Sequence, residues 1–323
     1  MPLLRTVLRK TLESLEIYWM LVRIMIPVTI LTELLSRLGL IKAVAPIFAP
    51  VMNLVGLPPE LGLAWLTAMI VGLWGAVPLL FTLVPASSLS VADVTVFSAL
   101  ILIAHGLPLE QKIIQKAGPG MVATTSLRIS GGLLYAVLLH HVLVATGWLS
   151  APVNPAWIPM SAAPDWTEFF HSLGATMIWM LAILVVLSWA LEILKMTGLL
   201  QLMMTALSPM LRLAGIRSEA GHLTAVGLFL GISYGAGLLI REAQSGALSP
   251  RQIFLACVFM GFAHSVIEDT ILVVSLGADV YGVLAGRLAF ALAATATVAI
   301  VLSRLSDEAL FAHVFRLSGA KAE

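Results

Sequence analysis

The sequence contains two related halves, and this internal repeat constrains the fold more than any other feature. When the chain is aligned with itself at an offset of 159 residues, without gaps, residue types that a Leu/Ala-rich chain supplies least freely coincide. The matched pairs include Ala104-His105 with Ala263-His264, Glu110 with Asp269, Arg128 with Arg287, Gly72 with Gly231, Gly118 with Gly277, Pro50 with Pro209 and Glu33 with Glu192. Two apolar halves in one membrane chain are typical of transporter-like architectures, in which a site lies where the halves meet.

Composition excludes a soluble globular domain. Of the 323 residues 60% are hydrophobic and 11% are charged, whereas soluble domains carry about 25% charged residues. The net charge of +1 indicates no nucleic-acid partner. The single cysteine, Cys257, lies in an apolar run, so we expect it to be buried and to form neither a disulfide nor a thiolate metal cluster. No phosphate-binding, dinucleotide-binding or HExxH motif is present, so we expect neither an enzyme nor a bound cofactor.

Apolar stretches of about 20 residues, long enough to cross a bilayer, recur in matched pairs. The first half has predicted spans at 17–37, 61–83 and 120–146, a short apolar piece at 44–55 and a polar-interrupted stretch at 91–117. The second half has predicted spans at 170–196, 220–242 and 279–303, a short piece at 200–214 and an interrupted stretch at 250–276.

These stretches divide the chain into five predicted parts. They are an amphipathic N-terminal helix lying on the membrane surface (1–16), a first repeat (17–147), a linker rich in Pro and Trp (148–167), a second repeat (168–304) and a cytoplasmic tail (305–323). Residues 1–16 are basic and apolar at helical spacing, and no small-residue cleavage site follows them, so we do not expect a cleaved signal peptide.

The orientation of the repeats depends on whether the interrupted stretches cross the membrane. If they cross, each half has four spans, the repeats are parallel, and a cytoplasmic N-terminus gives 8 basic residues inside and 7 outside. If they re-enter as hairpins, each half has three spans, the second half is inverted, and the division becomes 11 to 4. The positive-inside bias favours the second arrangement. A membrane-crossing 44–55 would also make the number of spans odd.

The fold class predicted from these patterns is an all-α polytopic membrane protein. It is built from two tandem repeats, inverted by the charge count, each with about three full spans, a short interfacial helix and a broken or re-entrant helix. The expected location is the inner (cytoplasmic) membrane, with both termini in the cytoplasm. Such a protein contacts membrane lipid, and a homo-oligomer is compatible with the sequence.

Ionisable residues stand in the middle of both interrupted stretches. The second half has His264, Glu268 and Asp269, and the first half has His105 and Glu110. Each such group costs about 2–3 kcal/mol or more at membrane depth, so these residues normally face protein or water and mark a site or pathway. A break at Gly106 and Pro108 would let them converge at the tip of a hairpin. The alternative interpretation is that His–Glu pairs only hold helices together.

Each half also places an arginine 18 residues after its carboxylate: Arg128 follows Glu110, and Arg287 follows Asp269. We expect an Arg–carboxylate pair in each half, which would neutralise charges too costly to bury alone. The alternative is that both arginines extend to the lipid headgroups.

A glycine-rich segment adds two candidate ligand contacts. Around Ser233 and Tyr234 the sequence reads GISYGAGLLIREA, and so many glycines in one turn weaken a helix and expose its backbone groups. Ser233 and Tyr234 would add side-chain hydrogen bonds to a ligand, whereas Gly227 and Gly231 are better explained by close helix packing.

Three segments carry a family resemblance: SYGAGLLIREAQSGALS (233–249), AHSVIEDTILVVSLGAD (263–279) and AHGLPLEQKIIQKAG (104–118). They resemble the nucleoside recognition, or Gate-domain, family of bacterial multi-pass membrane proteins, over about residues 60–145 and 219–304. Related gate domains occur in concentrative nucleoside transporters, ferrous-iron transporters and sporulation-linked membrane proteins. The resemblance implies an all-helical protein whose gate is formed by both repeats and which moves a small solute.

Three functions remain as alternatives. The first is a transporter or facilitator for a nucleoside-like or organic solute, coupled to an ion or proton, with no resident metal. Its predicted substrate- or ion-binding residues are His264, Glu268, Asp269, Ser233, Tyr234, His105 and Glu110, and its charge-pairing residues are Arg128 and Arg287. The second is a divalent metal ion permease, because His and carboxylate are competent ligands. The third is a non-transporting membrane subunit.

Overall fold

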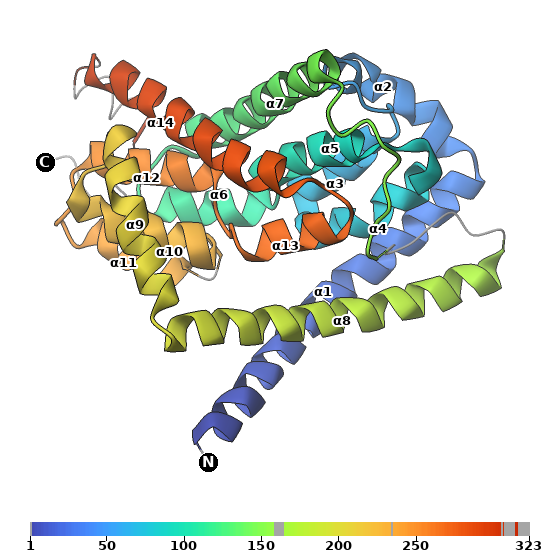
Figure 1. The fold of residues 1–323 in the computed structure, drawn as a ribbon, viewed down its shortest axis with the longest axis horizontal. Helices are drawn as coiled ribbons and strands as arrows, with labels where there is room; N and C mark the ends of the chain where they lie inside the picture. The colour runs from blue at the N-terminus through green and yellow to red at the C-terminus, as the bar shows by residue number, and fades with distance from the viewer. Residues whose placement is uncertain (1, 158–164, 234, 305, 307–313, 316–323) are drawn as a thin grey trace, which may run out of the picture.

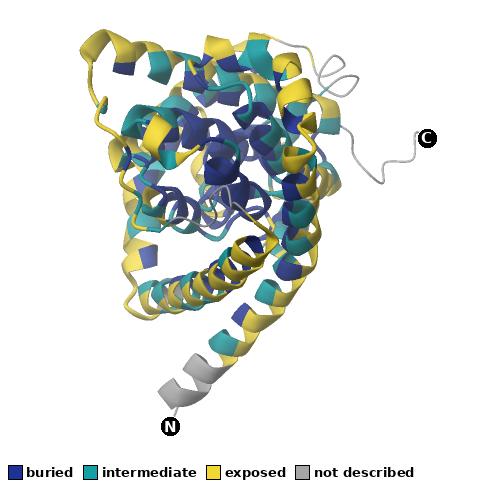
Figure 2. Cartoon of the chain, turned by 90° about the vertical axis from the view of Figure 1, so that its right-hand side faces the viewer, coloured by how far each residue is buried: buried dark blue, intermediate teal, exposed yellow. Residues whose placement is uncertain are grey.

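The computed structural model describes residues 2–157, 165–233, 235–304, 306 and 314–315. Over these residues the chain forms helices and two isolated bridges but no strand, so the fold is all-α (Figure 1). The buried residues gather in the middle of the molecule, and α1 and α8 lie at its edge (Figure 2). Tyr234 and most of the predicted tail (305–323) lie outside the described residues.

The element order repeats along the chain. The first half consists of α1 (Pro2–Arg37), α2 (Leu40–Leu54), α3 (Leu61–Val71), α4 (Leu73–Leu83), the short η1 (Ala86–Ser88), α5 (Val91–Ile103), α6 (Leu107–Lys116) and α7 (Met121–Thr146). The second half consists of α8 (Trp166–Met196), α9 (Leu199–Leu213), α10 (Ser218–Leu230), α11 (Ala236–Gln244), α12 (Pro250–Phe262), α13 (Glu268–Ser275), the π-helical η2 (Tyr281–Gly286) and α14 (Arg287–Ser303). The offset of 159 residues maps α2 onto α9 and α5 onto α12 residue for residue.

Serine caps fix where the two central helices begin. Ser90 precedes α5 and forms a capping box, in which its Oγ accepts from the backbone N–H of Asp93 at 3.1 Å while Asp93 Oδ2 accepts from the Ser90 N–H at 2.8 Å. Its repeat counterpart Ser249 caps α12 through the N–H of Gln252. The two halves therefore use the same local signal at the same position.

Backbone hydrogen bonds gather the ends of several segments around the first part of the linker. Val91 N–H donates to Ala151 O at 3.0 Å, Val153 N–H donates to Leu89 O at 3.0 Å, and Trp157 N–H donates to Ser275 O at 3.3 Å. We call this part of the molecule the linker end. The start of α5 and the end of α13 therefore lie there together.

The opposite part of the molecule is held by a second set of hydrogen bonds. Gln244 Nε2 donates to Lys116 O at 3.1 Å, and the Arg217 N–H donates to Gln252 Oε1 at 2.7 Å. In addition, the Arg251 guanidinium donates to Leu302 O. We call this part the N-terminal end, because Lys10 of α1 pairs with Glu192 near the end of α8 at 3.7 Å.

These two sets of contacts order the helices across the molecule. The α5–α6 pair runs from the linker end to the N-terminal end, whereas the corresponding α12–α13 pair runs from the N-terminal end to the linker end. Likewise α7 and α14 run in opposite senses and cross in projection (Figure 1). The corresponding elements of the two halves are thus inverted relative to each other.

Of the two forms expected for 91–117, broken or re-entrant, the structure has the broken one: the chain is interrupted at His105 and Gly106 and runs on across the molecule. The re-entrant elements are instead the predicted spans 61–83 and 220–242, which break into α3–α4 and α10–α11. Gly72, with φ 114°, ends α3 and lets the chain turn back toward the linker end, and Gly231, with φ 86°, does the same toward the N-terminal end. In each half, the described structure thus has one broken stretch that runs across the molecule and one stretch that turns back.

Five helices among the described residues are long and apolar enough to cross a membrane: Arg9–Arg37, Val91–Lys116, Met121–Thr146, Trp166–Leu194 and Tyr281–Ser303. The helix α1 is continuous over 36 residues, so the predicted surface helix 1–16 is not a separate element. The thiol of Cys257 is buried in α12, as expected.

Candidate functional site

The breaks in the two crossing pairs bring two histidines to the centre of the molecule. Between α5 and α6 the chain passes through His105 and Gly106, the latter with φ 56°, and between α12 and α13 it passes through His264 and Ser265, the latter with φ 46°. A positive φ at a serine is uncommon. The hairpin tips hold both breaks, since Gly106 N–H donates to Ala68 O and Val266 N–H donates to Leu228 O, each at 2.9 Å.

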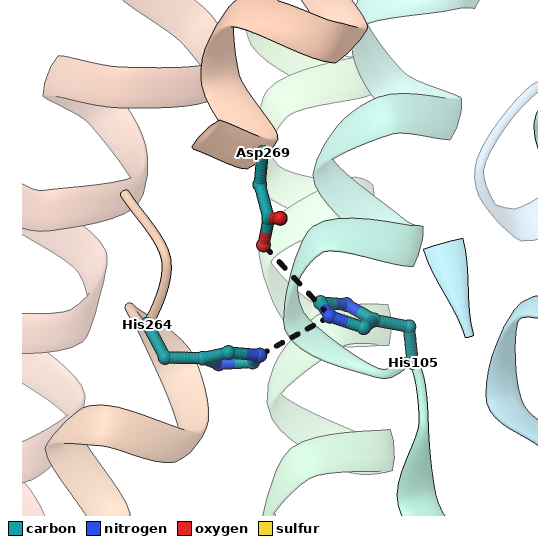
Figure 3. Close-up of side chains that lie close together, drawn as sticks. All are labelled: His105, His264 and Asp269. Atoms are coloured by element: carbon teal, nitrogen blue, oxygen red, sulfur yellow. Dashed lines mark hydrogen bonds and ion pairs between the residues drawn. The ribbon is translucent and has the colours of Figure 1, made fainter. Parts of the chain in front are cut away.

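The two imidazole rings face each other across the boundary between the halves (Figure 3). Their Nε2 atoms are 3.1 Å apart and their ring centroids are 4.8 Å apart. The Nδ1 atom of His105 lies 2.8 Å from Ile101 O, and the Nδ1 atom of His264 lies 2.9 Å from Met260 O. A carbonyl oxygen only accepts, so both Nδ1 atoms carry the proton, and in neutral rings both Nε2 atoms are acceptors.

Two carboxylates approach the same pair of nitrogens. Glu110 Oε1 lies 3.3 Å from His264 Nε2 and 4.0 Å from His105 Nε2, and Asp269 Oδ2 lies 3.8 Å from His105 Nε2. In the described part of the chain, Asp269 Oδ2 is buried and has no hydrogen-bond donor. We call His105, Glu110, His264 and Asp269 the central cluster. In the central cluster, four hydrogen-bond acceptors face one another: the two Nε2 atoms and one carboxylate oxygen from each acid. This arrangement is stable only with a proton or another cation among them.

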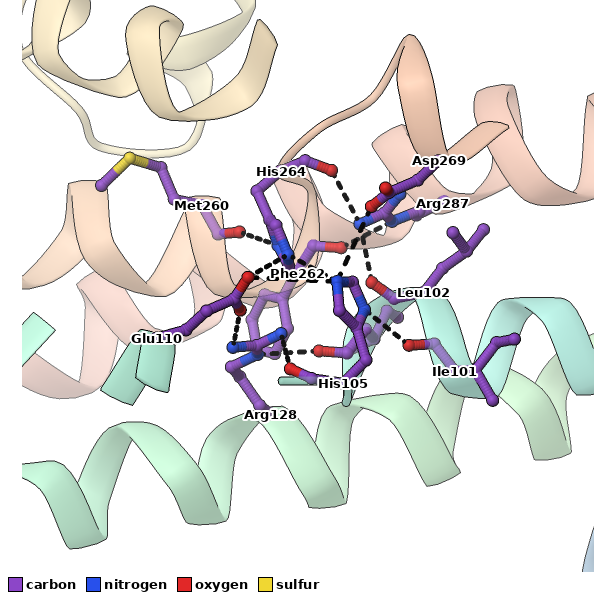
Figure 4. A network of polar contacts seen from close by, with 11 residues as sticks. Ile101, Leu102, His105, Glu110, Arg128, Met260, Phe262, His264, Asp269 and Arg287 are labelled. Atoms are coloured by element: carbon purple, nitrogen blue, oxygen red, sulfur yellow. Dashed lines mark hydrogen bonds and ion pairs between the residues drawn. The ribbon is translucent and has the colours of Figure 1, made fainter. Parts of the chain in front are cut away.

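Arg128 closes the expected ion pair in the first half (Figure 4). Its Nη1 donates to Glu110 Oε2 at 2.6 Å, its Nε donates to Ile103 O at 2.8 Å, and its Nη2 donates to His105 O at 3.0 Å. The side chain is 2% exposed, so it is not an arginine extended to the headgroups. It satisfies the carbonyls that the break in α5–α6 leaves without helical partners.

Arg287 repeats this arrangement only in part. Its Nε donates to Phe262 O at 2.8 Å, and its Nη2 donates to His264 O at 3.1 Å and to Leu102 O of the other half at 2.8 Å. Among the described residues its buried Nη1 has no acceptor, and no ion pair to Asp269 forms. Aspartate is one methylene shorter than the glutamate at the equivalent position, and its carboxylate lies toward His105 instead.

The two arginines and two carboxylates at the centre balance each other in charge, and an added cation is needed when Glu268 is ionised as well. Arg128 and Arg287 contribute two positive charges, and Glu110 and Asp269 contribute two negative charges when ionised. Glu268, next to Asp269 at the start of α13, adds a further negative charge when it is ionised, and it is only partly buried. One added cation then balances the group, which matters because an unpaired charge in a low-dielectric interior is costly.

The remaining predicted residues lie around the central cluster rather than in it. Glu268 lies near the indole of Trp74, at the start of α4. Ser233 is exposed in the break between α10 and α11, and no hydrogen bond joins it to the cluster within the described ranges. Sequence reasoning missed Trp74, although its repeat counterpart is Ser233 itself. It also missed the backbone carbonyls that orient both histidines and both arginines.

The chain belongs to the Gate family, described as nucleoside recognition, whose family model matches residues 18–117 and 177–279. A relative from Bacillus subtilis (strain 168), with the name uncharacterized membrane protein YvoD, is 27% identical over 286 residues, which cover 87% of this chain and 90% of the relative. No solved structure matches the chain significantly. Together with its long apolar helices, these similarities define a polytopic membrane protein of the Gate family.

Proposed function

We propose that this protein transports a small solute across the membrane, and that the central cluster binds the coupling cation, a proton being the simplest occupant. The observation that carries the proposal is the contact between His105 Nε2 and His264 Nε2 at 3.1 Å, with no donor between them. Because each histidine comes from a different half, a cation that joins them also joins the halves. Alternating access by movement of one repeat against the other would break and remake this bridge.

The polar breaks and glycine-rich tips support a solute path beside the cluster. Unwound backbone at membrane depth is stable only where it is buried in protein or lines a water-filled cavity. Both breaks and both hairpin tips meet at the centre of the described structure. Membership of a family described as nucleoside recognition makes nucleosides the first solutes to test. The expected location is the inner membrane, with the N-terminal end in the cytoplasm.

The test is uptake into proteoliposomes under an imposed pH gradient, using radiolabelled nucleosides and organic acids. His105→Gln and His264→Gln should each lower gradient-driven uptake at least about tenfold, because a glutamine amide does not take up a proton. The exposed His171 provides the matched control, and His171→Gln should transport normally. The proposal fails if the two central variants behave like His171→Gln, or if the unmodified protein moves none of these solutes.

A divalent metal ion is the second candidate cargo, favoured by one observation. Ligand atoms of His105, His264 and Asp269 lie within 4.8 Å of one another, and imidazole with carboxylate suits zinc, iron or manganese. Inductively coupled plasma mass spectrometry on the purified protein separates this candidate from proton coupling. A stoichiometric metal that is lost in both Asp269→Asn and His264→Gln would favour the permease.

A further inference from the structure

A cavity with charged residues in its lining lies between the α1–α8 pair and the start of α13. Its volume is about 200 Å³, several times the space of about 30 Å³ that one water molecule occupies in the liquid. Its lining includes Lys10, Ser14, Ser188, Glu192, Leu230 and Glu268. One wall therefore comes from the two peripheral helices, and the opposite wall comes from elements next to the central cluster.

The lining is charged toward the N-terminal end. Lys10 Nζ lies 2.6 Å from Glu13 Oε2 and 3.7 Å from Glu192 Oε2. Deeper along the same helices, Ser14 Oγ donates to Ser188 Oγ at 2.7 Å and joins α1 to α8. Charged side chains within apolar helices face protein or water rather than lipid, so this mouth is the part of the cavity that meets the aqueous phase.

Glu268 is the lining residue that adjoins the central cluster in the chain. This residue is the immediate neighbour of Asp269, whose buried Oδ2 has no donor in the described chain and lies 3.8 Å from His105 Nε2. A cation that reaches Glu268 has therefore only one residue left to pass before the central cluster. Glu13, Glu192 and Glu268 outnumber the one lysine, so the walls favour positive over negative species.

The inverted repeat provides an internal comparison. At the positions 159 residues away, Leu109 replaces Glu268 and Thr29 replaces Ser188. The positions that correspond to Lys10 and Ser14 in the second half are Phe169 and Leu173, and both are buried and apolar. Lys10 and Glu268 therefore have apolar counterparts on the other side of the molecule, whereas Ser188 and Glu192 have the polar counterparts Thr29 and Glu33.

We propose that this cavity is a water-filled cation vestibule, which connects the central cluster through Glu268 to the aqueous phase at the N-terminal end. The chemical class that it admits is protons and small inorganic cations. This inference rests on the proposed function for its purpose, but the accessibility of the cavity can be measured without any transport.

The test is cysteine accessibility in a Cys257→Ala background, which removes the one native thiol. Ser188→Cys and Glu268→Cys are placed in the cavity, and Thr29→Cys and Leu109→Cys are their matched controls at the repeat-related positions. Membrane-impermeant cationic and anionic thiol reagents are applied to either face of oriented vesicles. Gly246→Cys and Ala151→Cys report the two faces, because both positions are exposed, one at each end.

Ser188→Cys and Glu268→Cys should react only from the face that labels Gly246→Cys, and the two controls should stay unmodified. At position 188 the cationic reagent should react about tenfold faster than the anionic one, and a second change, Glu268→Gln, should reduce that preference severalfold. Ser188→Cys is a conservative change, so the test stands even if Glu268→Cys does not fold, which size-exclusion chromatography would show.

Three results would overturn the vestibule proposal. They are labelling of position 188 from the face that labels Ala151→Cys, equal labelling of the controls, and no preference for the cationic reagent. The proposed function fails separately. If position 188 labels as expected while His105→Gln transports normally, the vestibule stands and the coupling site does not.

Discussion

At the scale of single residues, the difference between Glu110 and Asp269 sets the properties of the centre. The longer side chain reaches Arg128 at 2.6 Å, while the shorter one leaves Arg287 Nη1 and its own Oδ2 without partners among the described residues. A buried ion pair that is fully hydrogen-bonded is costly to open. The first half of the centre is therefore fixed, and the second half has an open carboxylate that can respond to a cation.

Asp269→Glu tests this difference directly. The added methylene should let the carboxylate reach Arg287 Nη1, so we expect the thermal unfolding midpoint in detergent to rise, by the equivalent of about 1.5–3 kcal/mol for a charged hydrogen bond. Uptake should fall, because the open carboxylate is lost. The reverse change, Glu110→Asp, should lower the midpoint by a similar amount. An unchanged or lower midpoint for Asp269→Glu would contradict the open-pair interpretation.

The sequence already contained most of this site at the residue scale. His105, Glu110, His264 and Asp269 stand out because ionisable residues are rare in apolar stretches, and the structure brings these four together. The state of Arg287 could not be read from spacing, because both halves have the same 18-residue interval. The outcome depends on one methylene and on the direction in which Asp269 extends.

At the scale of elements, the charge count favours hairpins at 91–117 and 250–276, whereas in the structure 61–83 and 220–242 turn back. Both 61–83 and 91–117 are apolar and of spanning length, so hydropathy does not separate a helix that turns back from one that continues across. Polar residues in 91–117 suggested a hairpin tip. The turn occurs instead at Gly72 and Gly231, where the backbone conformation is one that only glycine adopts freely.

Gly231→Ala should therefore be harmful. Its φ of 86° strains any side chain, and a Cβ there would lie 2.3 Å from Ser265 Oγ, next to His264. We expect a loss of about 1–3 kcal/mol in stability together with impaired transport. The matched control is Gly174→Ala in α8, where a Cβ meets no atom within 4 Å and should stabilise the helix by about 0.5–1 kcal/mol. Equal thermal midpoints for the two variants would argue against a functional turn at Gly231.

At the scale of the whole molecule, the distribution of basic residues agrees with the observed crossings better than with the hairpin arrangement expected from the sequence. Arg23, Arg128 and Arg287 are left out of this count because they are buried or lie in the middle of a helix. The described chain contains 13 other Lys and Arg residues, and among these only Arg37 and Lys42 belong to the linker end. The other 11 belong to the N-terminal end. By the positive-inside rule we expect that end to face the cytoplasm.

A tag at Gly246 tests this orientation. In the structure the α11–α12 loop lies at the N-terminal end, which we expect in the cytoplasm, whereas the hairpin arrangement expected from the sequence would place it outside. We expect an epitope inserted at Gly246 to be protected in intact spheroplasts and accessible after lysis, and one at Ala151 to be accessible in both. The reverse pattern, or exposure of both tags, would refute the crossing order.

The apolar positions opposite the vestibule bear on how such a protein would keep its membrane tight. Leu109 and Phe169 carry no charge at the positions that correspond to Glu268 and Lys10, so the proposed entry for cations lies at the N-terminal end alone. Under the proposed function a resting molecule dissipates no electrochemical gradient, because cations that enter the vestibule stop at the histidine pair. Net transport of the solute then requires the protein to change conformation. The rate of cation leak and the rate of solute transport can therefore be measured separately.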